Sequence, residues 1–322
     1  MNKIKVGIIG GAGYTGGELL RLLINHSRAE IVFVHSRSHA GTLVSSVHKD
    51  LLGDTELKFT DALSNLIDVV FLCLAHGESK KIIWQIDLKV KVIDLSQDFR
   101  IAPNDSRSFV YGLPEINREE IKQASNIANP GCFATAIQLA LLPLAQSELL
   151  QSDITVSCTT GSTGAGQSLD ESLHFSWRQN NLSVYKAFTH QHLAEINKTI
   201  KQLQPDFNYN MFMFPQRGSF TRGILACLNL KIKNGIDSLQ TLYEEYYINH
   251  SFVHVSKTNV DLKQVVNTNK CLLYLEKNND QLMIVSVIDN LLKGASGQAV
   301  QNMNLLFELD ETTGLKLKAS AF

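Results

Sequence analysis

Residues 4–18 read Ile4-Lys5-Val6-Gly7-Ile8-Ile9-Gly10-Gly11-Ala12-Gly13-Tyr14-Thr15-Gly16-Gly17-Glu18. The apolar run before the glycines is typical of a buried parallel strand, and the residues from Glu18 onward favour a helix. Between them lies a GxGxxG motif, at the strand-to-helix position where that motif functions. Glycines there allow a tight turn and let backbone N–H groups approach a pyrophosphate at the helix N-terminus. The alternative is a plain glycine turn. The predicted cofactor contacts in this loop are Gly11, Gly13, Tyr14, Thr15 and Gly16.

The first 100 residues alternate between strand and helix patterns. Apolar runs at 31–34, 69–74 and 90–95 predict further strands, and helix formers at 18–23 and 80–86 predict helices between them. Repetition of strand, helix and strand is typical of an α/β domain with right-handed crossovers. We therefore expect a Rossmann-type, doubly wound parallel sheet.

The pattern changes after about residue 150. The segments 154–159 and 223–232 are rich in strand formers, and the polar turn 277–280 joins two further strand-like runs. Two runs joined by a polar turn predict a hairpin, and hairpins belong to antiparallel sheets. A second, α+β domain with a mixed or antiparallel sheet is the expectation. The helical pattern at 295–309 could pack back on the first domain.

Composition excludes several classes of protein. The chain has 322 residues, 44% of them hydrophobic, and a net charge of −1, which argues against nucleic acid as the main partner. No apolar run approaches the ~18 residues of a transmembrane helix, and the N-terminus has no secretory pattern. The five cysteines are odd in number, far apart and form no CxxC pair. We therefore expect a cytoplasmic protein without a disulfide framework or zinc knuckle.

The end of the second predicted strand indicates which dinucleotide is bound. An acidic residue there would accept a hydrogen bond from the ribose 2′-hydroxyl of NAD. The chain instead reads His35-Ser36-Arg37-Ser38. Arg37 could pair with a 2′-phosphate, with Ser36 and Ser38 adding hydrogen bonds, so the sequence favours NADP. The alternative is that Arg37 is a solvated surface charge.

One cysteine has the setting of a nucleophile. Asn129-Pro130-Gly131-Cys132 precedes an apolar helical stretch at 134–142, which places Cys132 at or near the first helical residue. Helix N–H groups and the macrodipole stabilise a thiolate there, and a thiolate can form a thioester with an acyl carbon. The other cysteines lie in strand-like runs and are expected to be small buried hydrophobes: Cys73, Cys158, Cys227 and Cys271.

A second glycine-rich loop spans Gly161-Ser162-Thr163-Gly164-Ala165-Gly166, with a helical stretch expected from Ser168. It lacks the ending of an ATP-binding P-loop. Its exposed N–H groups and hydroxyls, with Ser162 and Gly164 as contacts, could hold an acyl phosphate. A purely structural loop is the alternative. Arg100 and Arg222 are candidate anchors for substrate oxyanions by bidentate pairing.

Motifs of one kind of enzyme run nearly end to end along the chain. They are Gly10–Glu18, Ser36–Ser38 with Ala40-Gly41, Ser96–Arg100, Tyr111–Glu115, Asn129–Cys132, Gly161–Gly166 and Asp289–Ala295, continuing through Gly297–Asn304. In combination they resemble the N-acetyl-gamma-glutamyl-phosphate reductase family of arginine biosynthesis. The resemblance implies an oxidoreductase that uses NADPH to reduce an acyl phosphate to a semialdehyde and releases phosphate.

The resemblance also implies a domain organisation. A Rossmann domain, residues 1–131, would be completed by a C-terminal helix within 294–322. A catalytic and oligomerisation domain, 132–293, would form a homo-oligomer, a dimer or tetramer. Asn290 and Gly294 stand where the family places cofactor contacts.

The acid/base group is expected among paired histidines. A thiolate reductase needs a proton donor and acceptor near the sulfur, and histidine suits neutral pH. His190-Gln191-His192, followed by Glu195-Ile196, resembles the HxHxxEI segment of the family. We assign the acid/base role to His192 and a substrate or phosphate contact to His190, although the two could be exchanged. A metal site is disfavoured because no third ligand has suggestive spacing.

The chain departs from the family pattern before Arg222-Gly223-Ile224. The family commonly has a His-Leu-x-Pro-like run there, whereas this chain has Gln216 at the histidine position and Arg217 as an extra cation. One hypothesis is an acidic N-acyl group, as in an N-succinyl substrate, paired with Arg217. A solvent-facing substitution is the alternative.

Two other functions remain in competition. Aspartate-semialdehyde dehydrogenase shares this chemistry and architecture, but the HxHxxEI segment and the stretch 294–304 favour the first family. A non-catalytic NADP-binding redox sensor would use Cys132 as its sensing thiol. Such a sensor would have no need for His192 or for the loop at 161–166.

Overall fold

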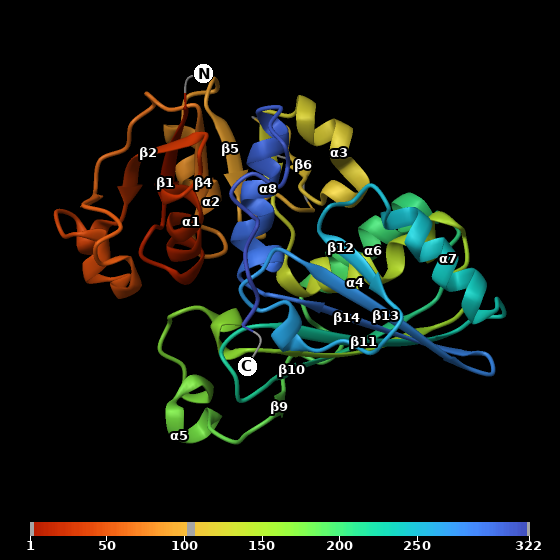
Figure 1. Ribbon diagram of the computed structural model, residues 1–322. Coiled ribbons are helices and arrows are strands. Elements are labelled where there is room, and N and C mark those ends of the chain that lie inside the picture. Colours follow the sequence, from red (N-terminus) through yellow and green to blue (C-terminus); the bar gives the residue numbers. More distant parts are fainter. Residues whose placement is uncertain (1–2, 102–106, 321–322) are drawn as a thin grey trace. The chain divides into compact units, whose positions relative to one another are not determined.

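The computed structural model describes residues 3–101 and 107–320 and divides the chain into two units (Figure 1). The first unit comprises residues 1–130 and 295–316, and the second comprises 131–294 and 317–322. Residues 1–2, 102–106 and 321–322 lie outside the described part. Each unit is built around a seven-stranded sheet. Within the described ranges, no helix is long and apolar enough to cross a membrane.

The sheet of the first unit is parallel and has the order β3-β2-β1-β4-β5-β7-β6. Its strands are β1 (Ile4–Ile9), β2 (Ala29–His35), β3 (Phe59–Thr60), β4 (Val69–Leu72), β5 (Lys91–Asp94), β6 (Val110–Tyr111) and β7 (Asn126–Ala128). The order reverses between β1 and β4, which is where open parallel sheets bind ligands at the carboxyl ends of their strands. The predicted Rossmann-type sheet is confirmed.

Helix α8 comes from the far end of the chain yet belongs to the first unit (Figure 1). The helices of this unit are α1 (Tyr14–Ile24), α2 (Ser79–Ile82), α3 (Pro114–Gln123) and α8 (Gly297–Leu306). Every residue of α8 is buried, polar ones included. Asn302 donates to the Gly112 carbonyl at 2.9 Å, and Asn304 bonds His26 Nε2 at 3.0 Å. Buried polar groups need such partners, so α8 is fixed by hydrogen bonds as well as by apolar packing.

The sheet of the second unit is mixed, in the order β12-β13-β14-β11-β8-β10-β9. Its strands are β8 (Ile154–Thr160), β9 (Ser183–Val184), β10 (Met211–Arg217), β11 (Ile224–Lys231), β12 (Val253–Ser256), β13 (Cys271–Asn278) and β14 (Gln281–Ile288). β10 runs parallel to β8 and β12 parallel to β13, while the other pairs are antiparallel. The predicted mixed-sheet α+β domain is confirmed.

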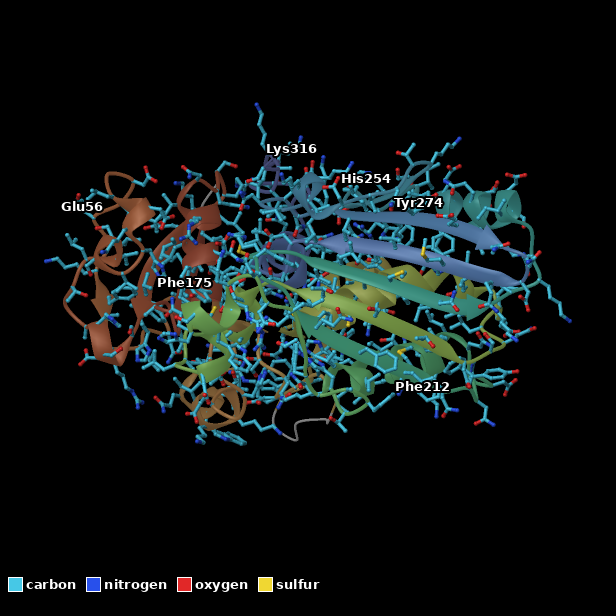
Figure 2. The ribbon with its side chains drawn as sticks, turned by 90° about the horizontal axis from the view of Figure 1, so that it is seen from below. Glu56, Phe175, Phe212, His254, Tyr274 and Lys316 are labelled. Atoms are coloured by element: carbon cyan, nitrogen blue, oxygen red, sulfur yellow. The ribbon has the colours of Figure 1, made fainter. Side chains whose placement is uncertain are left out.

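The helices of the second unit are α4 (Cys132–Gln146), α5 (Phe175–Arg178), α6 (His192–Leu203) and α7 (Ile236–Tyr247). α4 packs against β11 and β14, and α6 packs on α4. Figure 2 shows the sheet with its side chains, with Phe212 on β10 and Tyr274 on β13. The predicted hairpin is β13–β14, whose turn is only Asn279-Asp280, with Asn279 at φ 53°.

The helix expected from Ser168 is wrong. The segment instead forms a short 3₁₀ turn at Glu171–Leu173 and the single-turn helix α5. Phe175, which Figure 2 labels, and Leu169 are both largely exposed. A helix in water is stabilised mainly by burying one apolar face, and these side chains bury none.

The four cysteines expected to be small buried hydrophobes divide into two pairs. Cys158 and Cys271 are buried, whereas Cys73 and Cys227 are half-buried, and all are free thiols. Cys73 lies just beyond β4, which ends at Leu72 rather than at 74. Burial raises the pKa of the Cys73 thiol to about 12, so this thiol stays protonated and unreactive at neutral pH.

Candidate active site

The first glycine loop links the carboxyl end of β1 to the N-terminus of α1. The N–H groups of Gly10 and Gly11 both donate to the His35 carbonyl at 3.1 Å, which ties the loop to the end of β2. A Cβ at Gly16 would lie 2.7 Å from the carbonyl oxygen of Gly10, so the close packing of loop and helix requires glycine there. N–H groups in the first turn of a helix have no acceptor within the helix. The loop therefore fits a pyrophosphate.

His48 supports this loop, although no sequence pattern points to it. Its Nε2 lies 2.8 Å from the Gly11 carbonyl oxygen, and its ring fills the space where a Cβ at Gly17 would stand. The side chain is buried, and burial lowers the pKa of His48 below its ordinary value. A neutral imidazole that donates from Nε2 thus holds the glycine loop in place.

The end of β2 carries a cluster of polar groups. Arg37 and Ser38 are exposed in a 3₁₀ turn, and Ser36 is buried beside them. The Ser38 and Ser36 hydroxyls lie 2.9 and 3.3 Å from His39 Nδ1. An exposed arginine that stands in sequence between two serines, whose hydroxyls converge on an imidazole, fits a phosphate monoester such as a ribose 2′-phosphate. Sequence reasoning missed His39 of this group.

Arg100 is buried in the first unit and holds backbone carbonyls. Its Nε donates to the Asn129 carbonyl and its Nη2 to the Leu95 carbonyl, both at 2.9 Å. These bonds brace the residues that follow β5 and β7. The role of Arg100 as a substrate anchor stays a prediction.

Cys132 is the first residue of α4, the longest helix of the second unit. Gly131 caps the helix in an extended conformation, and its carbonyl accepts from the Thr135 N–H at 2.8 Å. The Cys132 side chain is half-buried. A thiol at this place meets the positive end of the helix dipole, which favours the thiolate.

Two glycines pack directly against the thiol-bearing residue and its neighbours. A Cβ at Gly294 would lie 2.8 Å from the Cβ of Cys132, and one at Gly131 would lie 2.3 Å from His192 Nε2. Any larger residue at either position would displace Cys132 or the His192 imidazole. Gly294 therefore contacts the thiol-bearing residue, and its predicted cofactor contact is untested.

His192 begins α6 and is linked to the α4 N-terminus through Glu195. The Gly131 N–H donates to Glu195 Oε2 at 3.0 Å, and His192 Nε2 lies 3.9 Å from Glu195 Oε1. Both side chains are buried. The arrangement holds the His192 imidazole beside Gly131, the residue that precedes Cys132, and the acid/base role of His192 stays a prediction.

His190 lies beside His192 but has a different character. The ring centroids are 4.6 Å apart, and His190 Nδ1 accepts from the His192 backbone N–H at 3.3 Å. Burial, and then the charge of Lys186, lower the pKa of His190 to about 4. His190 is therefore neutral at pH 7, with its proton on Nε2, and can donate a hydrogen bond but not act as an imidazolium acid.

Arg222 is engaged by a carboxylate of the same unit. Its Nε and Nη2 donate to the two oxygens of Asp289 at 3.0 and 3.2 Å. Asp289 is fully buried and also accepts from the backbone N–H groups of Asn267 and Leu291. This pair fixes the turn that leads to Gly294, so bidentate pairing of Arg222 with substrate would compete with Asp289.

Asn290 braces the same turn with both ends of its amide. Its Oδ1 accepts from the Gly223 N–H at 2.7 Å, and its Nδ2 donates to the Thr163 hydroxyl at 3.0 Å. The residue is buried. The structure thus gives Asn290 a bracing role, and its predicted cofactor contact is untested.

The second glycine loop differs from expectation in its backbone. The N–H groups of Gly161, Ser162 and Thr163 donate to the carbonyls of Gly223, Phe220 and Thr221 at 2.9–3.1 Å. The expectation that these three N–H groups are exposed is wrong, because the segment that precedes β11 supplies their acceptors, and the predicted acyl-phosphate contact of this loop stays a prediction. The predicted substrate contacts of Ser162 and Gly164 are then limited to the Ser162 hydroxyl and the loop surface.

Arg217 ends β10 next to an aromatic ring. Its guanidinium carbon lies 4.5 Å from the ring centroid of Tyr185, within range of a cation–π contact. Arg217 is half-buried rather than solvent-facing. Gln216 faces the other way, bonding Ser157 and Thr159. Within the described ranges, no group of three or more His, Cys, Asp and Glu residues is placed to hold a metal ion.

Two family models match the chain. Residues 5–124 match the semialdehyde dehydrogenase NAD-binding domain, and residues 132–290 match the semialdehyde dehydrogenase dimerisation domain. The first unit therefore contains the NAD-binding domain of this enzyme family, and the second unit contains the family's dimerisation domain.

Curated relatives match over their whole length. The N-acetyl-gamma-glutamyl-phosphate reductase of Bacteroides thetaiotaomicron is 56% identical over 99% of this chain and 100% of its own. The enzymes of the same name from Bacteroides fragilis and Flavobacterium johnsoniae are 57% and 54% identical, each over 99% of this chain and 100% of their own.

Solved structures share the fold at low identity. Aspartate semialdehyde dehydrogenase II of Vibrio cholerae, complexed with ASA, has a TM-score of 0.76 at 16% identity, covering 96% of this chain and 99% of its own. The Candida albicans enzyme with NADP has a TM-score of 0.71 at 15% identity, covering 95% and 99%. Such likeness supports the architecture, whereas the identity of the curated relatives distinguishes between the two dehydrogenase families.

Proposed function

Since this chain belongs to the N-acetyl-gamma-glutamyl-phosphate reductase family, we propose that it reduces N-acetyl-gamma-glutamyl phosphate to the 5-semialdehyde with NADPH, releasing phosphate. The observation that carries the proposal is Cys132 at the N-terminus of α4, with the His192 ring against Gly131. This is an activated thiol beside an acid/base group, which acyl-phosphate reduction requires.

Cys132 performs the acyl transfer in this mechanism. Its thiolate attacks the γ-acyl carbon, a C–S bond forms, the C–O bond to phosphate breaks, and inorganic phosphate leaves. A thioester on Cys132 results, so covalent catalysis divides one difficult reduction into two easier steps. The nicotinamide, when bound, supplies the hydride that reduces this thioester.

His192 moves the proton. Reduction of the thioester leaves a thiohemiacetal on Cys132, and its collapse breaks the C–S bond and returns the thiolate. His192 holds a proton for the oxyanion and takes it back as the aldehyde forms. Neutral His190 donates from Nε2 to a substrate oxygen, because the charge state set by burial suits a hydrogen-bond donor.

NADP is the proposed cofactor. Arg37, Ser36 and Ser38 would bind the 2′-phosphate, and the loop 11–16 would bind the pyrophosphate. These residues suit the group because Arg37 is exposed between two serines and β2 ends without a carboxylate. The two compact units correspond to the proposed cofactor-binding and catalytic domains.

A homo-oligomer formed through the second unit completes the proposal, in line with the dimerisation-domain match. We favour a dimer or a tetramer. The cytoplasmic location expected from the sequence stays a prediction.

Trapping the thioester tests this function. Wild-type protein mixed with N-acetylglutamate 5-semialdehyde and NADP, without phosphate, should form about one NADPH per active site and then stop, because the acyl-enzyme has no acceptor. Added phosphate should restart turnover. Mass spectrometry should find the acyl group on the peptide that contains Cys132.

The Cys132→Ser variant is the matched control and should fold and bind NADPH but show no burst. An acyl label on another side chain would contradict the assignment of the nucleophile. A redox sensor would show no phosphate-dependent reduction of NADP, and aspartate semialdehyde as the better substrate would favour the other dehydrogenase family.

A further inference from the structure

We propose that Arg217, oriented by Arg178 and stacked on Tyr185, is the ligand for a carboxylate of the substrate, separate from the acyl phosphate. This subsite rests on the proposed function. The carboxylate has two possible sources on an N-acylglutamyl compound, which are the α-carboxylate and a second carboxylate at the end of a dicarboxylic N-acyl group.

Arg217 lies on the same face of the second unit's sheet as Cys158, near the start of α4 where Cys132 stands. β10 and β8 pair in parallel with Pro215 opposite Cys158 and Arg217 opposite Thr160. Side chains alternate along a strand, so these residues share one face. Helix α4, which begins at Cys132, packs against β11, and β11 pairs with β8 so that Ala226 lies opposite Cys158. Burial, and then the charge of Cys132, raise the pKa of the Cys158 thiol, in line with this placement.

Tyr185 connects Arg217 to the histidines. Its ring lies under the Arg217 guanidinium and 5.9 Å from the His190 ring, which in turn contacts His192. Burial, and then the charge of Cys132, raise the pKa of the Tyr185 hydroxyl. Arg217 therefore lies one aromatic ring away from the histidine pair, a fitting place for the part of a substrate remote from its reacting carbon.

The two guanidinium groups of this region, those of Arg217 and Arg178, form no ion pair within the described residues, 3–101 and 107–320. The Nε of Arg217 is buried and has no hydrogen-bond partner in that part of the chain. A buried donor without a partner is costly, and a bound carboxylate would satisfy it. Lys186 adds a third cation near His190.

Arg178 is the positioning residue. It is buried and donates to the carbonyls of Ser172 and Arg217 and to the Ser183 hydroxyl at the start of β9. These bonds fix the backbone from which the Arg217 side chain projects. Asp170 is exposed and accepts from the Ser172 N–H, and hydrogen bonds from Ser172, followed by the charge of Arg217, lower the pKa of this carboxyl.

Kinetics with three semialdehydes test the subsite. The compounds are N-acetylglutamate 5-semialdehyde, its α-carboxamide and N-succinylglutamate 5-semialdehyde, each with NADP and phosphate. The variants are Arg217→Gln and Arg217→Lys. The control is Lys231→Gln, because Lys231 is exposed and ends β11, whereas the start of β11 is the end of that strand nearer to Arg217. Arg217→Gln should raise KM by about 10- to 100-fold for the compound whose carboxylate it binds, with kcat nearly unchanged.

The pattern of loss identifies the source. A loss with N-acetylglutamate semialdehyde that its carboxamide does not show identifies the α-carboxylate. A loss confined to the N-succinyl compound identifies the acyl carboxylate. In either case Arg217→Lys should recover most of the affinity and Lys231→Gln should match wild type. Equal changes for all three compounds, no change for any, or a loss in kcat alone would overturn the proposal.

Binding measured without turnover keeps the two proposals distinguishable. Calorimetric titration of N-acetylglutamate, its α-carboxamide and N-succinylglutamate into wild type and Arg217→Gln should show the same selective loss. If wild type binds these acids through Arg217 but catalyses no phosphate-dependent NADP reduction, the subsite stands and the proposed function fails. If binding is the same in both proteins, the subsite is refuted whatever the activity.

Discussion

Two glycine-rich loops, 10–16 and 161–166, each follow a strand, yet they use their backbone in opposite ways. The first leads directly into α1, whose first-turn N–H groups have no acceptor within the helix. In the second, the N–H groups of Gly161, Ser162 and Thr163 already donate to carbonyls at 220–223. The first loop ties the N–H groups of Gly10 and Gly11 to the His35 carbonyl and offers the donors at the start of α1 to a ligand, whereas the first three N–H groups of the second loop bind the segment that precedes β11.

The difference comes from the element on the C-terminal side of each loop. A helix of full length after a glycine turn leaves a row of orphan donors and a positive dipole end. The second loop is succeeded only by a 3₁₀ turn and the single-turn helix α5, and antiparallel pairing of β8 with β11 brings acceptors alongside it. Glycines alone therefore do not make an anion site.

The largest expected contrast between the loops is steric. Gly16→Ala would put a Cβ 2.7 Å from the Gly10 carbonyl oxygen, so the loop must shift and NADPH affinity should fall by roughly 100-fold. The free energy of unfolding should fall by about 1–3 kcal/mol. Fluorescence titration with NADPH and thermal unfolding measure both quantities.

Gly164→Ala is the matched change in the second loop. The atom nearest to its Cβ would be the Thr160 hydroxyl oxygen, at 3.1 Å, so we expect normal NADPH affinity and a small loss of stability. Equal losses in the two variants would contradict the distinction between the loops.

The next largest effect is expected on the preference for NADPH over NADH, which depends on the end of β2. Arg37→Ala should weaken NADPH binding by about tenfold and leave NADH binding unchanged, since only NADPH carries the 2′-phosphate. Competition titrations with both dinucleotides measure the ratio. Equal losses of NADPH and NADH affinity would show that Arg37 does not bind the 2′-phosphate and would favour the alternative that it is a solvated surface charge.

A smaller effect, on the free energy of unfolding, is expected from the Thr163 hydroxyl, which braces the second loop. Thr163→Val keeps the side-chain shape but removes the hydrogen bonds to the Thr221 carbonyl and from Asn290. The free energy of unfolding should fall by about 1 kcal/mol, because the buried Asn290 amide loses its acceptor. Denaturant titration measures the loss, with Thr155→Val on the exposed side of β8 as control. A KM for phosphate that rises while stability is unchanged would show that this loop binds anions after all.

The smallest effect is a pH dependence confined to the first loop. Burial lowers the pKa of His48 below about 6.5, so the fold favours the neutral ring. The neutral His48 ring therefore contributes its full stability above the pKa of an unfolded histidine. This contribution is lost as the pH falls through the lower pKa that His48 has in the folded protein. His48→Gln can keep a donor to Gly11 but cannot titrate. Between pH 7.5 and 5.5 the free energy of unfolding should therefore fall more steeply in wild type, by at most about 1 kcal/mol, in thermal unfolding experiments. Parallel curves would contradict it.

Local patterns predicted the parts of the fold that are locally determined. The apolar run of β1, the glycines after it and the turn before α4 all act within a few residues, so they could be recognised directly. The helical start at Cys132 and the hairpin β13–β14 are confirmed for the same reason. β10 was missed because Pro215 lies in its middle and proline is depleted in strands.

The parts of the site that could not be predicted depend on partners distant in sequence. Asp289 engages Arg222 across 67 positions, and His48 reaches Gly11 across 37. Residue type alone indicated a free guanidinium at 222 and no role for His48. Such pairings arise only when strand order brings the segments together, so side-chain roles were harder to predict than elements.

The position of α8 has a consequence for biosynthesis of the chain. The first unit is assembled from the two ends of the polypeptide, with nearly all of the second unit inserted between them. During translation, β1 and α1 are synthesised long before α8, the buried helix that completes their unit, because residues 131–294 are made in between. The inserted unit can fold before α8 has been synthesised, while the nucleotide-binding unit is still incomplete. A chain truncated before residue 297 should therefore keep an intact thiol-bearing unit and have an incompletely folded Rossmann unit.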